Sequence, residues 1–259
     1  MISLIDDSRE SEPQLPAAYD YIFFEQVDSL RDKAAELANK GSDEGCLIWS
    51  INQKKARARQ HKTWVCNTGD LHCSIILRPD FEPSEFYQML IVAIVSLGNS
   101  IASYVSPMTA LGYQWPNDIC IANHKIASLW LDKGKSNGTD WLTITLSVNV
   151  LNAPDDPQIN AISIREVEGS TDLNNKILLE SFAREFIKQI NNWAQRGYKY
   201  IFDQWRIRLQ HFDQVIALKQ GTETITGTVK NVDGFGNIEV CIGDQVRNIS
   251  IQNHMELNE

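Results

Sequence analysis

Apolar residues recur along this chain with helical spacing in four segments. In one of them, residues 83–104, apolar side chains fall three to four positions apart. That period places them on one face, which predicts a long helix buried on one side. The other predicted helices are 30–40, 173–197 and 200–209. Asp28 or Ser29 is placed to cap the first of these three, and Gly41 to end it.

Short apolar or alternating runs between turn residues predict β-strands. In the first two thirds of the chain these runs are 21–24, 46–51, 64–66, 71–77, 119–122, 128–133 and 141–150, with a further short extended piece at 162–167. Strands interspersed with helices indicate an α+β domain, in which helices pack against a mixed β-sheet.

The end of the chain has a different pattern. Its predicted elements are four short strands, 215–218, 222–232, 238–242 and 246–251, separated by glycine-containing turns. Their number and spacing predict a small all-β module with a barrel-like arrangement. We therefore divide the chain into an N-terminal tail (1–20), an α+β domain (21–212) and a small all-β domain (213–259).

Composition narrows the classes of function. The formal net charge of −9 disfavours general nucleic-acid binding. No run of 18 apolar residues occurs, so no membrane span is expected. The acidic start does not resemble a secretory signal, and the five scattered cysteines favour reduced thiols in a cytoplasmic protein. The dispersed histidines give no reason to expect a structural metal site.

A run of special residues stands in the middle of the chain. Trp115, Pro116, Asn117 and Asp118 are followed by a short apolar run, a turn pair and Lys125. This pattern predicts a hairpin that returns Lys125 to the level of Asn117 and Asp118. A lysine beside an amide and a carboxylate could hold an acyl phosphate or a nucleotide.

The loop 52–62 contains five lysines and arginines in eleven residues. Arg57 and Arg59, two positions apart, could both face one anion through their guanidinium groups. From the residues alone, a phosphate-binding loop and a solvated basic loop remain equally open.

The order of these features resembles the biotin protein ligases, enzymes that join biotin to the carrier domains of carboxylases. The basic loop precedes Trp64, and a strand ending in Leu77-Arg78-Pro79, a long helix, the Trp-Pro-Asn-Asp run and Lys125 follow. The resemblance extends over about residues 20–255. It implies a biotin/lipoate ligase-like α+β catalytic domain followed by a small SH3-like β-barrel.

The resemblance also implies a role for each matching residue. Those with implied catalytic roles are Lys125, which polarises the biotin carboxylate and phosphate, and Arg57 and Arg59, which close over biotinyl-adenylate. Those with implied substrate contacts are Ser29, Gln53, Trp64, Asn117 and Asn149. Asp118 is implied to help place Mg²⁺ with ATP. The implied partner is a biotin carboxyl carrier domain.

No DNA-binding role is expected, because only about 20 residues precede the catalytic-type domain, too few for a helix-turn-helix module. A homodimer is left open.

Several positions depart from the family pattern. Glycines of the family are replaced at Ala56, Ala58, His61, Ser128, Thr145 and Ser147, and Leu30 and Arg31 stand where the family has polar residues that bind biotin. Gln114 replaces a usual Lys, and Asp70 a usual Asn. Two alternatives to a biotin ligase follow. One is a ligase or transferase of the same fold that acts on lipoate or another acyl acid. The other is a non-catalytic relative that binds a ligand or a carrier protein.

Overall fold

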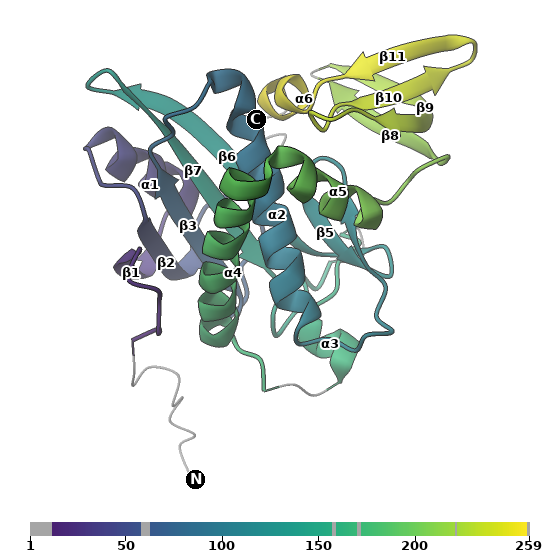
Figure 1. The fold of residues 1–259 in the computed structure, drawn as a ribbon. Helices are drawn as coiled ribbons and strands as arrows, with labels where there is room; N and C mark the ends of the chain where they lie inside the picture. The colour runs from purple at the N-terminus through teal and green to yellow at the C-terminus, as the bar shows by residue number, and fades with distance from the viewer. Residues whose placement is uncertain (1–11, 58–62, 157–158, 170–171, 221, 258–259) are drawn as a thin grey trace.

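The computed structural model describes residues 12–57, 63–156, 159–169, 172–220 and 222–257. Its main body is a seven-stranded mixed sheet with strand order β1-β2-β3-β7-β6-β5-β4 (Figure 1). The strands are β1 (Asp20–Val27), β2 (Cys46–Gln53), β3 (Leu71–Leu77), β4 (Leu111–Gln114), β5 (Asp118–Ile121), β6 (His124–Ser136) and β7 (Thr139–Val148). Strands β1 and β2 are parallel, and the other neighbours are antiparallel. The predicted α+β class is confirmed.

Helices cover the apolar face of this sheet. They are α2 (Phe86–Ala102), which follows a short 3-10 turn (Pro83–Glu85), α4 (Asn175–Arg196) and α5 (Tyr198–Arg208). Alternate residues of the central strands, such as Cys73, Ile75 and Leu146, join α2 and α4 in one buried cluster. The segment Pro83–Ala102 is long and apolar enough to cross a membrane, but 83% of its most apolar window is buried inside the protein. Its composition is therefore that of a core helix.

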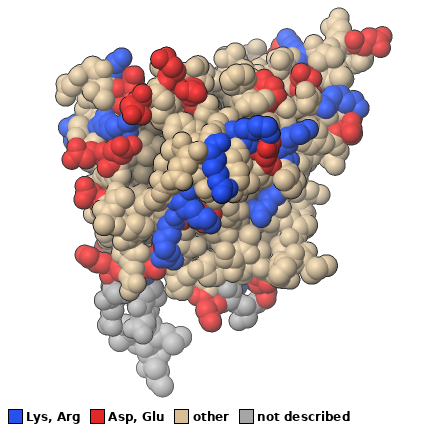
Figure 2. All heavy atoms as spheres, viewed as in Figure 1, with Lys and Arg blue, Asp and Glu red and all other residues tan. Residues whose placement is uncertain are grey.

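The solvent side of this helical layer is polar. Figure 2 shows Lys and Arg side chains gathered over α4 and the start of α5. Two of these lysines form ion pairs along their own helices, Lys188 with Glu185 and Lys199 with Asp203. Exposed pairs of this kind contribute only about 0.2–1 kcal/mol, so this is an ordinary solvated helix surface.

The opposite face of the sheet is buried but polar. Because residues paired across antiparallel strands share a face, Asp118 on β5, Ser128 on β6 and Ser147 on β7 lie side by side. Other buried polar side chains of this face are Ser50, His72, Ser74, Thr143 and Thr145. Helix α1 (Leu30–Asn39) covers one end of it, in a small cluster with Ile48 and Ile76. The candidate site lies on this polar face of the sheet, which we call the floor of the site.

The C-terminal region forms a second, four-stranded antiparallel sheet with order β11-β10-β9-β8. Its strands are β8 (Val215–Gln220), β9 (Glu223–Val232), β10 (Ile238–Ile242) and β11 (Gln245–Ile249). Buried residues of this sheet, among them Val229 and Val240, belong to the same cluster as the main domain. Trp115 also joins the two parts, because its Nε1 donates to the carbonyl of Gly236 at 2.9 Å. The division at residue 213 stays a prediction.

Three predicted strand segments are wrong in part or whole. Residues 64–66 form no strand, because the backbone N–H of Trp64 bonds to Ala56 and not to a sheet neighbour. The segment 162–167 contains helix α3 (Ile164–Glu168), which starts at a reciprocal capping box of Ser163 and Glu166. The last predicted strand ends early, and helix α6 (Ile251–Leu257) follows it.

Candidate functional site

The predicted hairpin exists, and its turn is one residue earlier than expected. Ala122 and Asn123 form the turn with φ of 48° and 66°, the left-handed pair that a two-residue hairpin loop requires. Cys120 pairs with Lys125 and Ile119 with Ala127, so one strand carries an extra residue, a β-bulge. Lys125, as the partner of Cys120, shares the sheet face of Asp118, and the bulge brings Ser128 instead of Ala127 opposite Asp118, which the sequence pattern did not reveal.

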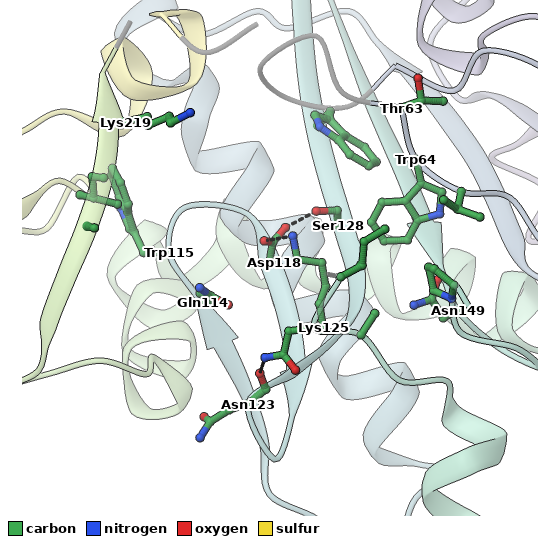
Figure 3. Close-up of a pocket in the computed structure, with 18 of the residues that line it drawn as sticks. Thr63, Trp64, Gln114, Trp115, Asp118, Asn123, Lys125, Ser128, Asn149 and Lys219 are labelled. Carbon is green, nitrogen blue, oxygen red and sulfur yellow. Dashed lines mark hydrogen bonds and ion pairs between the residues drawn. The ribbon is translucent and has the colours of Figure 1, made fainter. Parts of the chain in front are cut away.

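Lys125 and Asp118 form an ion pair at the floor of the site. The Nζ of Lys125 lies 2.6 Å from Oδ2 of Asp118, whose side chain is 3% exposed while that of Lys125 is 30% exposed. The hydroxyl of Ser128 donates to the other carboxylate oxygen of Asp118 (Figure 3). Both oxygens of a buried carboxylate are thus held, and the ammonium group is presented toward the open side.

These residues open into a cavity of about 470 Å³. That volume is typical of small-molecule sites, about 300–1,000 Å³. One side of the cavity belongs to the main sheet and its loops, and the other to the C-terminal region (Figure 3). The C-terminal residues that line it are Ala217, Leu218, Lys219 and His254. The cavity therefore lies between the two parts of the chain.

Aromatic side chains form two walls of the cavity. Trp64 and Trp130 meet edge to face, with ring centroids 5.8 Å apart. On the C-terminal side, Trp115 packs against His254 at 4.6 Å between ring centroids. Trp64 was expected at the site, and it lines the cavity. Trp130, Lys219 and His254 were missed, because no local motif marks them and only the tertiary fold places them there.

The two asparagines that were expected at the site have different positions. Asn149 lines the cavity and is fully buried; its Nδ2 donates to the carbonyl of Ile162 at 3.3 Å, while its Oδ1 has no partner among the described residues. Asn117 is outside the set of residues that line the cavity. Its Nδ2 donates to the carbonyl of Leu129 at 2.6 Å. Asn117 thus fastens the hairpin, and Asn149 offers an acceptor to a ligand.

The residues expected to bind the acid near α1 are engaged with the protein. Ser29 caps α1, with its hydroxyl accepting from the N–H of Asp32 at 3.3 Å. The Oε1 of Gln53 accepts from the N–H of Leu30 at 2.7 Å. Neither Ser29 nor Gln53 is among the described residues that line the cavity. Both satisfy helix N–H groups that would otherwise be buried without partners.

The described part of the basic loop lies near α1, at the same end of the polar sheet face as Ser29 and Gln53. Nη2 of Arg57 lies 3.1 Å from Asp132 and 3.5 Å from Asp32, and the Arg57 side chain is 42% exposed. Arg57 is not one of the described residues that line the cavity. Arg59 lies outside the described residues. The implied closure of both arginines over an adenylate stays a prediction.

Two buried titratable groups lie next to the floor of the site: His72 on strand β3, and Asp70 immediately before that strand. Burial raises the pKa of Asp70 to about 7, against the effect of the backbone N–H bonds that it accepts from Asn67 and Val150. Burial also lowers the pKa of His72 to about 4, so its ring is neutral at pH 7. The ring bonds through Nδ1 to the Ser147 hydroxyl at 2.9 Å. The neutral His72 ring thus supports the floor without supplying charge to it.

The residues that line the cavity fit a nucleotide that binds together with its metal ion. Lys125 and Lys219 can face phosphates, and aromatic side chains can flank a base. Among the described residues there is no group of three metal-ligating side chains. A lone carboxylate, Asp118, agrees with Mg²⁺, which usually takes one or two carboxylates and completes its shell with phosphates and water. Asp118 is paired with Lys125, so it would be available to a cation only if Lys125 moved to another anion.

Comparison with known proteins places the chain in a family. The model of the Biotin/lipoate A/B protein ligase family matches residues 61–207, which is more than half of the chain. The chain belongs to this family. The matched stretch contains the hairpin, Lys125 and the tryptophan wall.

Individual relatives are distant. The chain is 23% identical to the biotin–[acetyl-CoA-carboxylase] ligase of Paracoccus denitrificans over 216 residues, which cover 82% of this chain and 90% of that protein. The structure of biotin protein ligase from Aquifex aeolicus in complex with biotin and ATP matches with a TM-score of 0.74 at 19% identity, covering 89% of this chain and 95% of that one.

A biotin protein ligase-like protein of unknown function from Silicibacter matches with a TM-score of 0.76, also at 19% identity. The match covers 94% of this chain and 99% of that one. At such identities the structural matches establish the fold.

Proposed function

We propose that this protein is an ATP-dependent ligase that activates a carboxylic acid as its adenylate and transfers the acyl group to a lysine of a carrier domain. The observation that carries the proposal is the position of Lys125, whose ammonium group lies at the floor of a ligand-sized cavity. The family to which the chain belongs is one of ligases. Biotin is the acid that the sequence resemblance implies, and the Paracoccus relative is named for it.

The reaction proceeds in two steps. A carboxylate oxygen of the acid attacks the α-phosphorus of ATP, the bond to the bridging oxygen breaks, and pyrophosphate leaves. The amine of the carrier lysine then attacks the acyl carbon of the mixed anhydride, loses a proton, and AMP leaves. Neither step requires covalent chemistry on the protein, so the protein contributes positioning and charge stabilisation.

Lys125 is the central group in this proposal. The substrate carboxylate and the α-phosphate would replace Asp118 as the partners of its ammonium group, which offsets the negative charge that builds up as the two anions approach. Ser128 keeps Asp118 oriented during this exchange. The freed carboxylate oxygen would help to hold Mg²⁺, which supplies further charge neutralisation at the phosphates. The tryptophan walls limit the access of water to the adenylate.

A second candidate is the same reaction with another acid, such as lipoate. The observation that favours it is the engagement of Ser29 and Gln53 in capping α1. A buried polar substrate ring would lose these two side chains as hydrogen-bond acceptors, and each unmade buried bond costs about 1–3 kcal/mol.

The test is acid-dependent exchange of labelled pyrophosphate into ATP by the purified chain. Biotin, lipoate and simple acids are supplied one at a time, and a carrier domain is then added to measure acyl transfer by mass. The proposal expects exchange that needs both ATP and an acid. A folded protein that exchanges pyrophosphate with none of the acids would instead support the non-catalytic alternative.

A further inference from the structure

A buried ion pair lies behind the aromatic wall of the cavity. Arg31 of α1 is 2% exposed and forms two hydrogen bonds to the carboxylate of Asp132 on β6, from Nε at 2.9 Å and from Nη2 at 2.5 Å. The Asp132 side chain is 10% exposed. Breaking such a pair on one side leaves a buried charge without its partner, so both groups are held firmly in place.

This pair supports Trp130 from behind. Trp130 and Asp132 are two residues apart on β6 and therefore share a sheet face. The guanidinium carbon of Arg31 lies 5.8 Å from the centroid of the Trp130 ring, within the range of a cation–π contact. The other side of Trp130 meets Trp64 in the cavity wall. With Arg31 behind it and Trp64 in front, the indole cannot swing toward α1.

Distances along β6 then limit the length of a bound acid. Lys125 holds its ammonium group at Asp118, which pairs in the sheet with Ser128. From Ser128 to Trp130 is two residues, or about 7 Å of strand. An acid whose carboxylate lies at Lys125 and whose tail runs along β6 therefore reaches the tryptophan wall after only about that length.

We propose that Trp130, supported by the Arg31–Asp132 pair, ends the acid-binding part of the cavity and selects carboxylic acids with a short, flat, apolar tail. This inference rests on the proposed function and narrows its substrate. Such a tail would pack against Trp64 and Trp130. The valerate chain and fused polar rings of biotin extend further than a tail of about 7 Å, and the acceptor atoms of Ser29 and Gln53 are engaged in capping α1.

The experiment compares acids in the pyrophosphate exchange assay with the full chain. For the wild-type protein we expect kcat/KM with hexanoate or phenylacetate to exceed that with biotin or lipoate by about 10-fold or more, the scale on which an apolar pocket discriminates by size. Trp130→Ala removes the end wall, so we expect the preference to shift by about 10-fold or more toward biotin and lipoate.

The matched control is Trp141→Ala, which removes another buried tryptophan from the neighbouring strand β7. Trp141 is 5% exposed, packs under α1 and is not among the described residues that line the cavity. We expect it to lower stability without changing the order of the acids.

The outcomes separate this inference from the proposed function. Wild-type exchange that is as fast with biotin as with the short acids overturns the inference and leaves the ligase proposal intact. A folded Trp130→Ala protein with an unchanged order of acids also overturns it. If that variant does not fold, the wild-type comparison decides alone. If the protein still binds ATP but none of the acids supports pyrophosphate exchange, both the ligase proposal and this inference are wrong.

Discussion

The sequence resemblance implies that residues at both ends of the polar sheet face contact one ligand. In the structure, the side chains at the two ends have different kinds of partners. At the hairpin end, Lys125 stands in a cavity and its ion pair with Asp118 can be exchanged for a substrate anion. At the α1 end, Ser29 and Gln53 are bonded to the first turn of the helix. The ammonium group of Lys125 reaches the cavity and can change partners, whereas the acceptor atoms of Ser29 and Gln53 hold backbone N–H groups of α1.

Arg31→Leu is expected to have the largest effect on stability at the α1 end. It leaves the carboxylate of Asp132 buried with only the half-exposed Arg57 as a cation, so we expect a loss of about 3–5 kcal/mol in the free energy of unfolding. Urea denaturation measures it.

The control is Lys33→Ala on the same helix, which removes an exposed pair with Glu36 and should cost about 1 kcal/mol or less. Equal losses for the two variants would mean that Arg31 does not anchor α1 to the sheet.

Ser29→Ala tests the difference between the two ends more sharply. As a helix cap, Ser29 should contribute about 0.5–2 kcal/mol to stability, and its loss should leave the KM for the acid unchanged. Thermal unfolding and exchange kinetics are measured on the same sample. A raised KM at unchanged stability would show that Ser29 is a substrate ligand, and the contrast between the two ends would be lost.

A pH dependence of stability is expected at Asp70. Its pKa is raised from 3.8 to about 7 in the fold, so between these values the folded chain keeps a proton that the unfolded chain releases. The contribution of Asp70 to stability is then full at low pH and is lost as the pH rises to about 7.

Asp70→Asn should remove this loss. We expect the difference in melting temperature between variant and wild type to shift in favour of the variant by on the order of 10 °C from about pH 4 to about pH 8. A difference that stays flat with pH would indicate that Asp70 is ionised throughout.

The sequence predicted the elements whose signals are local. The period of apolar residues located the long helices, and the turn chemistry after Asp118 located the hairpin that brings Lys125 back to it. The α3 helix was missed, although Ser163 and Glu166 have the spacing of a capping box.

Features that depend on tertiary contacts were not predictable from local pattern. Three features arise from the register and packing of distant segments: the bulge that brings Ser128 opposite Asp118, the pairing of Arg31 with Asp132, and the wall supplied by His254 from the C-terminal region. Each joins residues that are separated in sequence or depends on how two strands align, and no single segment encodes it.

Under the proposed function, Lys125 is the central charged group of the adenylation site, so substitution of that residue is the most direct test. Acid-dependent pyrophosphate exchange is measured for the wild type, Lys125→Met and Lys135→Met, the last removing an exposed lysine further along the same strand. We predict that Lys125→Met lowers kcat/KM by about 100-fold or more, the scale of losing a charge-stabilising group, while Lys135→Met leaves it within about twofold. Exchange by a folded Lys125→Met protein at the wild-type rate would contradict the account.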